Sequence, residues 1–340
     1  DRHTQWVNSY QGHPLVADTQ DAEHNEYWPG GRTNHYWFDL NRDWLLAINP
    51  ESRGKLKWYH EWYPNVVTDF HEMGSQSTYF FEPMKPNGSL NPIMPKKNYE
   101  DLNTIFGNYF AKALDSIGSF YFTKEAFDGT YPGYGSSYPD IQGGLGLLFE
   151  QASSRGHKQK TAFGEITFPF TIRNQYTSSI TTVKAAVENK ELLRTYQKEF
   201  FKTAMMNSAI KGIQGYSFGD RYDKNRIKAF IDKLLIHKIN VYKYGNESYV
   251  VPTSQPQYRM VQTMFEAYKK YRDSVFYDAS AWSVANFYNI NYSGLRRVSL
   301  GEKINSTADL INIDPVQKSE YAYIIDWDDY NAPAVLNFLQ

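Results

Sequence analysis

Apolar residues along the chain follow two periods, one typical of helices and one typical of buried strands. Helical spacing predicts helices at 54–63, 98–117, 179–205, 225–237 and 257–271, with a last helical stretch at 332–339. Short apolar runs predict strands at 66–70, 119–122, 145–149, 212–218, 239–242 and 248–252. Strands that alternate with helices of this length favour an α/β architecture.

The predicted helix at 179–205 is amphipathic, with its apolar residues on one face. These residues are Val183, Val187, Leu192, Tyr196 and Phe200. The first 54 residues instead lack periodic apolar positions and are predicted to form long loops around a short ordered segment at 37–40.

The pattern restarts near residue 208, where a strand, a helix and a strand make one βαβ-sized unit over 212–242. We therefore expect one domain over residues 1–207 and a second, smaller α/β domain over 208–340. The last helical stretch ends at Gln340 without a closing signal. The second domain is accordingly expected to be incomplete.

Composition narrows the function classes. Hydrophobic residues make up 41% of the chain and aromatic residues 17%, which excludes a disordered or fibrous protein. The net charge of −1 offers nothing to attract nucleic acid, and no apolar run reaches the ~18 residues of a membrane span. The absence of Cys excludes disulfides and thiol chemistry.

Three short clusters carry residues suited to chemistry. The first contains Asp39-Leu40-Asn41-Arg42, the second is Val67-Thr68-Asp69-Phe70-His71-Glu72, and the third runs from Tyr131 through Gly135 and Ser136 to a strand that ends at Glu150. Taken singly, each has an ordinary structural interpretation: a capped turn, a polar residue after a strand, and an ion-pair partner. As an ordered set over roughly residues 1–200, they resemble the M14 zinc metallocarboxypeptidase family.

This resemblance implies a carboxypeptidase-like fold, a mixed sheet flanked by helices, and a role for each cluster. Asn41 and Arg42 would bind the terminal carboxylate of the substrate, His71 would be the third zinc ligand, and Glu150 would be the general base. Tyr131 would be the tyrosine that closes over the substrate, with Tyr134 as the alternative. The second substrate-binding arginine would be Arg32, with Arg2 as the alternative.

The residue types suit these roles. The guanidinium of Arg42 can meet a carboxylate through two parallel hydrogen bonds, which a Lys ammonium cannot do. A neutral His71 imidazole is a good zinc ligand. Glu150 follows an apolar strand, and partial desolvation there would let it accept a proton from water and pass it to a leaving amine.

The chain departs from the family at the first zinc motif. The family carries His-x-x-Glu (or Asp) before the Asn-Arg pair, and none of the eight His residues has Glu or Asp three positions later. We therefore expect the two other zinc ligands upstream of Asp1, in a longer protein. Residues 208–340 more weakly resemble a glutamine-amidotransferase-like domain, degenerate here because the nucleophilic Cys is missing.

The expected function is zinc-dependent hydrolysis of a peptide or amide bond near a free C-terminal carboxylate. One alternative is an N-acyl amino acid deacylase of the same superfamily, and another is an inactive protein that keeps only the carboxylate pocket. The expected partner is a peptide or N-acyl amino acid substrate, and the expected location is periplasmic or secreted. No oligomeric state is predicted.

Overall fold

A computed structural model describes residues 33–86, 90–154, 157–210, 212–267, 282–310 and 316–340. The chain forms two compact units that interleave along the sequence. Among the described residues, the first unit holds 33–45 and 63–197, and the second holds 46–62, 198–267, 282–310 and 316–340. The contiguous division at 207/208 stays a prediction about domains, and the compact units differ from it because residues 46–62 group with the second unit.

The first unit is built on a three-stranded mixed sheet. Strand β3 (Leu145–Ala152) lies in the middle and is buried along its whole length. Strand β1 (Val66–Met73) pairs with it in parallel, and β2 (Tyr79–Phe81) pairs with it in the antiparallel direction. The continuous apolar run of β3 fits a strand covered on both faces. The mixed sheet predicted for this part of the chain is confirmed.

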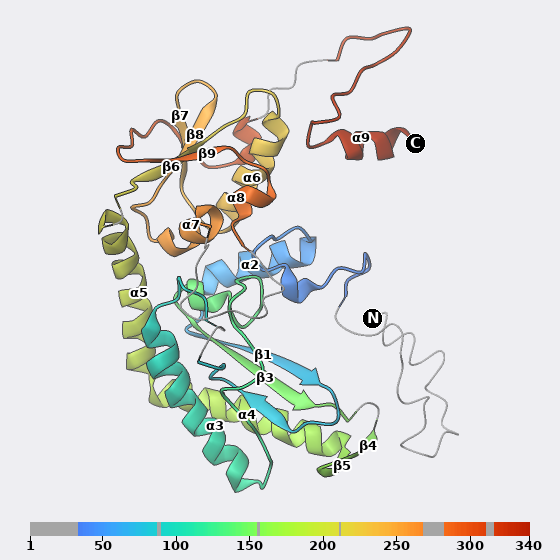
Figure 1. Cartoon of the computed structure of the whole chain (residues 1–340), viewed down its shortest axis with the longest axis vertical. Coiled ribbons are helices and arrows are strands. Elements are labelled where there is room, and N and C mark those ends of the chain that lie inside the picture. Colours follow the sequence, from blue (N-terminus) through green and yellow to red (C-terminus); the bar gives the residue numbers. More distant parts are fainter. Residues whose placement is uncertain (1–32, 87–89, 155–156, 211, 268–281, 311–315) are drawn as a thin grey trace. The chain divides into compact units, whose positions relative to one another are not determined.

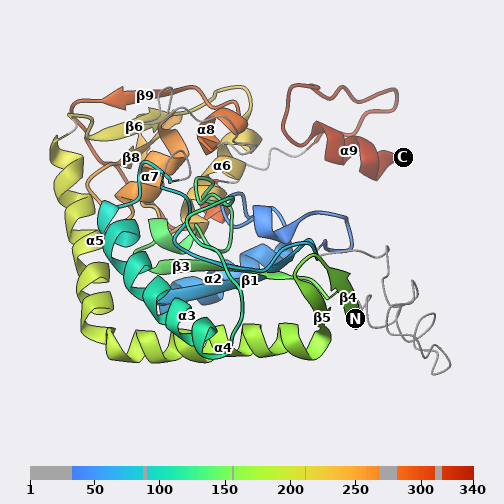
Figure 2. The same ribbon diagram turned by 60° about the horizontal axis from the view of Figure 1, so that its bottom comes forward.

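Helices and a hairpin complete the first unit (Figures 1 and 2). They are the short helices η3 (Leu40–Arg42) and η5 (Pro139–Ile141), the π-helical segment η4 (Asn98–Asn103), α3 (Thr104–Ser116), the hairpin β4 (Lys158–Thr161)–β5 (Gly164–Thr167), and α4 (Phe168–Glu188). The Thr167 hydroxyl caps α4 by accepting a hydrogen bond from the amide of Phe170. Helix α3 packs against α4.

The loop between residues 131 and 144 lies directly on β3. A Cβ added at Gly146 would lie 1.6 Å from the carbonyl oxygen of Ser136, so only Gly allows this approach of the two backbones. Gly135 in the same loop is less confined, since its Cβ would lie 2.9 Å from a side-chain atom, Asp69 Oδ2. These two glycines let the loop settle over the end of the sheet.

The second unit contains a five-stranded antiparallel sheet in the order β10-β7-β8-β6-β9. Its strands are β6 (Gly215–Phe218), β7 (Val241–Tyr244), β8 (Ser248–Pro252), β9 (Tyr292–Leu295) and β10 (Lys303–Ile304). Its helices are α2 (Pro50–Trp62), α6 (Lys224–Ile236), α7 (Tyr258–Phe265), α8 (Val284–Phe287), η6 (Thr307–Leu310) and α9 (Ala332–Leu339). Helix α5 (Lys190–Ile210) begins in the first unit and continues in the second.

The strand, helix and strand predicted over residues 212–242 are present as β6, α6 and β7. Strand β8 lies between β6 and β7 and is antiparallel to both, so β6 and β7 are parallel but not neighbours. Two other expectations about elements are wrong. Residues 119–122 form no strand; one isolated bridge joins Phe122 to Phe80. The helix predicted at 179–205 is two helices, α4 and α5, separated at Asn189.

The apolar face predicted for that helix is also wrong in its first half. Val183 and Val187 are exposed, whereas Tyr196 and Phe200 are buried. Helix α4 therefore does not bury its valines against the sheet. Within the described ranges, no helix has the length and apolarity needed to cross a bilayer.

Candidate functional site

Four of the six residues that were first choices for a site role line one cavity of about 170 Å³ in the first unit. They are Asn41, Arg42, His71 and Glu150, which come from η3, β1 and β3. The remaining lining residues are Asp69, Phe127, Asp128, Tyr134, Ser136 and Leu148. Segments distant in sequence thus converge on one polar cavity.

The sheet places the acid and the imidazole side by side. His71 on β1 is the direct register partner of Glu150 on β3, and Asp69 is the partner of Leu148 two positions earlier. Directly paired residues of neighbouring strands point to the same face of a sheet. The His71 and Glu150 side chains therefore both face the cavity, while Phe70 and Phe149 stack on the opposite face with ring centroids 4.6 Å apart.

Asn41 links the strand to the loop above it. Its Oδ1 accepts a hydrogen bond of 2.7 Å from the Gly135 amide, which fixes the orientation of the side-chain amide. Its Nδ2 then donates to Asp69 Oδ2 at 3.1 Å and lies 2.8 Å from His71 Nε2. Asn41 is held on η3, whose start is capped by Asp39 accepting from the Asn41 amide.

The Nε2 atom of His71 has both an acceptor and a donor beside it. Asp69 Oδ1 lies 2.7 Å away and can accept a proton from Nε2–H. When Nε2 carries no proton, it can accept from Asn41 Nδ2 at 2.8 Å. The ring is therefore oriented by Asp69 and Asn41 whichever nitrogen carries the proton.

Arg42 lies at the exposed rim of the cavity. Its guanidinium carbon lies 4.5 Å from the centre of the Tyr134 ring, a cation–π contact. Its Nη1 donates to the Asn41 carbonyl at 3.2 Å and lies 3.8 Å from Asp39 Oδ2. In the part of the chain that the structure describes, these polar contacts all use Nη1, which leaves Nη2 and Nε for a ligand.

The two candidate tyrosines occupy different positions. Tyr134 lines the cavity, whereas Tyr131 is buried and donates its hydroxyl to the Arg42 carbonyl at 3.0 Å. Burial, together with the nearby Asp43 and Tyr134, raises the pKa of Tyr131 to about 12, so its hydroxyl stays protonated. The structure therefore places the alternative tyrosine, Tyr134, in the lining of the cavity, whereas Tyr131 contacts the Arg42 backbone.

Charges within the cavity are unevenly distributed. Asp69, Asp128 and Glu150 contribute carboxylates to its lining, while positive charge comes from Arg42 and, when protonated, from His71. An anionic ligand would therefore be directed to the Arg42 rim rather than to the floor.

Two further carboxyl groups, those of Glu82 and Asp140, are bound to the first half of β3. Glu82 Oε1 accepts the Leu148 amide at 2.9 Å, and Asp140 Oδ1 accepts the Gly146 amide at 2.9 Å. Beyond the end of β2, the two carboxyl groups thus accept hydrogen bonds from β3 amides that a neighbouring strand would otherwise accept. Burial raises the pKa of Asp140 to about 7, and burial together with the Asp140 charge raises that of Glu82 well above its usual range.

Arg32 and Arg2, the candidates for a second substrate-binding arginine, lie outside the described residues. Five lining residues received no role from the sequence: Asp69, Phe127, Asp128, Ser136 and Leu148. Strand alternation carries the signal for two of them, since Asp69 precedes His71 by two residues and Leu148 precedes Glu150 by two. The other three lie on loops, where no periodic signal exists.

The zinc ion implied by the family resemblance does not fit the described residues alone. His71 is the one predicted ligand among them, and its Nε2 already contacts Asp69 and Asn41. Nowhere in the described ranges do three His, Asp or Glu side chains converge as a metal site requires.

Comparison with known proteins gave no relative. No protein-family model, no curated protein and no solved structure matches the chain. The cavity itself is therefore the basis for a proposed function.

Proposed function

We propose that this cavity binds the free carboxylate end of a peptide or N-acyl amino acid, and that the protein is a hydrolase of the neighbouring amide bond. The observation that carries the proposal is the convergence of Asn41, Arg42, His71 and Glu150 on one cavity. These residues come from three separate segments of the chain, η3, β1 and β3.

Arg42 supports the carboxylate part of the proposal. Its guanidinium lies at the rim, stacked on Tyr134, with Nη2 and Nε turned to no described hydrogen-bond acceptor. A planar guanidinium held in this way can meet a carboxylate with two parallel hydrogen bonds. The cavity acids would repel the same carboxylate from the floor, so the ligand would enter with its amide bond toward Glu150.

Glu150 supports the hydrolytic part. Its side chain is only 9% exposed and shares the cavity with the His71 imidazole. In the proposed reaction Glu150 accepts a proton from water, the resulting hydroxide oxygen bonds to the amide carbonyl carbon, and the C–N bond breaks as Glu150 returns the proton to the amine. One water is consumed, and a carboxylate and an amine are released.

Zinc remains a prediction of the family resemblance. When bound, it would polarise the carbonyl and activate water. Two further ligands would be needed besides His71, and the described residues do not supply them.

Ligand-detected NMR on the whole chain tests the proposal. Saturation-transfer spectra would be recorded with N-acyl dipeptides, N-acyl amino acids and the C-terminal amides of both. We expect transfer to the free acids and little to the amides. Equal transfer to acids and amides would contradict the proposal.

Product analysis of the bound acids separates the alternatives. Mass spectrometry in excess zinc would show the peptide bond cleaved for a carboxypeptidase and the acyl group released for a deacylase. Binding without cleavage of either bond would contradict the hydrolytic part and leave a carboxylate-binding protein.

A further inference from the structure

A cavity of about 370 Å³ lies in the second unit, at one end of its antiparallel sheet. Strands β6 and β7 end there, and β8 and β9 begin there. The lining residues are Ser217, Phe218, Gly219, Tyr244, Ser248, Asn291, Tyr292 and Ser293. None of these side chains is an acid or a base of the Asp, Glu, Lys, Arg or His type, so this second-unit cavity differs in chemistry from the one that Arg42 lines.

Strand pairing brings the hydroxyl groups of the second-unit cavity to one face of the sheet. Tyr244 is the register partner of Ser248, and Ser217 is the register partner of Ser293. Ser217 also pairs with Val250, which lies two residues after Ser248. Paired residues, and residues two apart on one strand, point to the same face of a sheet. The four hydroxyl-bearing side chains are therefore placed together by the register of four strands.

The opposite face of β6 belongs to the apolar core of this unit. The ring centroid of Phe218 lies 5.3 Å from that of Phe230 on α6 and 5.9 Å from that of Phe265 on α7. The aromatic packing that joins β6 to its helices therefore does not use the hydroxyl groups.

Gly219 has no side chain to fill the cavity that it lines. A Cβ added at this position would lie 2.7 Å from the carbonyl oxygen of Glu247 and 3.0 Å from Ser248 Oγ. Only Gly allows the end of β6 to approach the start of β8 this closely. The hollow between the strands thus depends on this residue.

Five polar side chains of the second-unit cavity have no hydrogen-bond partner within the described ranges of the chain. They are Ser217, Tyr244, Ser248, Asn291 and Ser293. The Tyr292 hydroxyl differs, since it donates to the Phe265 carbonyl at 2.6 Å. Each free hydroxyl can donate and accept a hydrogen bond, and the Asn amide also does both. The cavity therefore offers uncharged donors and acceptors to a ligand.

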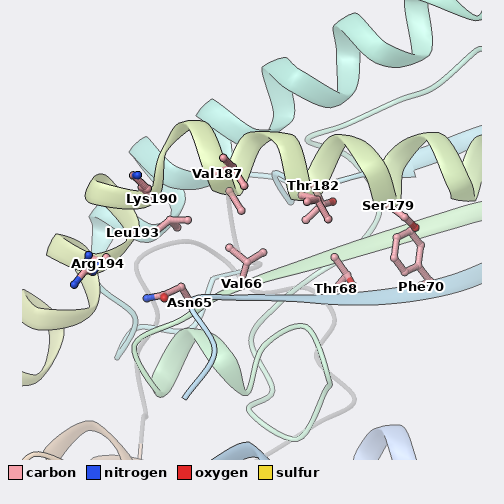
Figure 3. Close-up of a pocket in the computed structure, with 12 residues that line it drawn as sticks. Asn65, Val66, Thr68, Phe70, Ser179, Thr182, Val187, Lys190, Leu193 and Arg194 are labelled. Carbon is pink, nitrogen blue, oxygen red and sulfur yellow. The ribbon is translucent and has the colours of Figure 1, made fainter. Parts of the chain in front are cut away.

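Polar lining is not a general feature of the cavities in this chain. The larger cavity of the first unit, about 620 Å³, has apolar walls that include Val66, Phe70 and Val187 (Figure 3). Two basic side chains, Lys190 and Arg194, lie at one end of it (Figure 3). The uncharged, hydroxyl-rich lining is thus particular to the second-unit cavity.

This lining selects among ligand classes. A charged ligand would lose hydration there without meeting an opposite charge. An apolar ligand would cover the hydroxyl groups and leave them without a partner. A ligand rich in hydroxyl groups avoids both penalties, because its hydroxyls also donate and accept.

We propose that the second-unit cavity binds a neutral saccharide. The sugar hydroxyls would replace water at the Ser and Asn side chains, and the Tyr244 ring would offer an apolar surface to the C–H groups of the sugar. The volume lies at the low end of the range of about 300–1,000 Å³ found for small-molecule sites, which suits a mono- or disaccharide.

Saturation-transfer NMR on the whole chain tests the proposal. The probes would be glucose, galactose, N-acetylglucosamine, maltose and cellobiose, with glucuronate and glucosamine as charged counterparts and cyclohexanol as a ring that has one hydroxyl. We expect transfer to at least one neutral sugar, and little to the charged sugars or to cyclohexanol, because a site built for hydroxyl groups rejects an analogue that lacks them.

Variants locate the binding. Ser217→Ala/Ser293→Ala removes two hydroxyls that make no hydrogen bond to the described residues, so the fold should persist while sugar affinity falls by about tenfold or more. Ser293→Ala alone changes an exposed position, and it should weaken binding in the same direction even if the double variant is unstable. Ser254→Ala, at an exposed serine beyond the other end of β8, should bind like the wild type.

Three results would overturn the proposal. The first is no transfer to any neutral sugar, and the second is equal transfer to the charged sugars or to cyclohexanol. The third is unchanged sugar affinity in both serine variants, which would place the sugar elsewhere. No residue of the second-unit cavity lines the cavity of the proposed hydrolase, so either proposal can fail while the other holds.

Discussion

His71 and Glu150 are direct partners across the parallel strands β1 and β3, and both side chains face the same cavity. Parallel pairing makes their relative position a property of the sheet, because neither residue lies on a loop. Asn41 connects the loop around Gly135 to β1, because its side-chain amide accepts a hydrogen bond from the Gly135 amide and donates one to Asp69.

The proposed role of Glu150 as general base predicts that its substitution lowers turnover without weakening ligand binding. Glu150→Gln keeps the shape of the side chain and removes the proton acceptor. With excess zinc present, we expect the turnover number to fall by ~10²–10⁴-fold, while affinity for free-acid ligands changes little. Steady-state kinetics and calorimetric binding measure the two quantities. The assignment would fail if affinity were lost and turnover kept.

The bridging role of Asn41 predicts a local loss of order. Asn41→Ala removes the acceptor of the Gly135 amide and the donor to Asp69. We expect the free energy of unfolding to drop by about 1–3 kcal/mol, since a buried donor loses its partner. Hydrogen exchange at Gly135 should quicken while exchange in β3 stays slow. Unchanged exchange at Gly135 would show that the loop is held by other contacts.

The raised pKa of Asp140 predicts that the free energy of unfolding depends on pH. Its pKa rises from 3.8 in the unfolded chain to about 7 in the fold because of burial. The folded protein therefore holds the proton more tightly, and the free energy of unfolding should fall as pH rises from about 4 to about 7. Above pH 7 this contribution should be constant.

Asp140→Asn provides the test of that dependence. The Asn oxygen can still accept from Gly146 and Asn98 but carries no charge at any pH. Denaturant melts at pH 4.5 and 8 should show that the wild type loses a few kcal/mol more than the variant, at about 1.4 kcal/mol per pKa unit. Asp101→Asn, at an exposed carboxyl, should behave like the wild type. Parallel pH curves for all three proteins would contradict the assignment.

The zinc content of the purified chain can be predicted from His71, the one predicted ligand among the described residues. A single imidazole cannot form a tight zinc site. Elemental analysis of the purified chain should therefore give well under one equivalent of zinc after mild chelation, and His71→Ala should give the same value. Stoichiometric, chelator-resistant zinc would mean that ligands other than those described here complete the site.

Sequence reasoning succeeded where one physical signal dominated. The apolar run of β3 is buried in the middle of the first unit, and β1 beside it is half-buried, so both positions could be predicted from hydrophobicity alone. The same reasoning placed His71 and Glu150 at the ends of the two predicted strands. The predicted capped turn from Asp39 to Arg42 is the η3 helix with its Asp39 cap.

It failed where tertiary contacts overrode the local pattern. In α4, Asn174 donates a hydrogen bond to Ser119 and Ser178 accepts one from the Tyr79 hydroxyl. These bonds turn the polar side of α4 inward, so Val183 and Val187 do not mark the buried face. Phe120 is largely exposed although its neighbours suggested a strand. The position of β8, between the parallel strands β6 and β7, depends on contacts between distant segments that leave no local pattern. The choice between Tyr131 and Tyr134 likewise required the geometry of the loop.

The central claim is that Arg42 recognises a free carboxylate, and a binding cycle with Arg42→Lys tests it most directly. Calorimetry would give affinities of the wild type and the variant for an N-acyl dipeptide and for its C-terminal amide. Arg173→Lys serves as the control, since Arg173 also stacks on an aromatic ring, that of Phe170. Hydrogen bonds to charged groups are worth about 1.5–3 kcal/mol, so Arg42→Lys should weaken the free acid by about tenfold or more. The amide should change less than about twofold, because it never used the paired hydrogen bonds of the guanidinium. Equal weakening of acid and amide would contradict the claim and make Arg42 a structural partner of Tyr134.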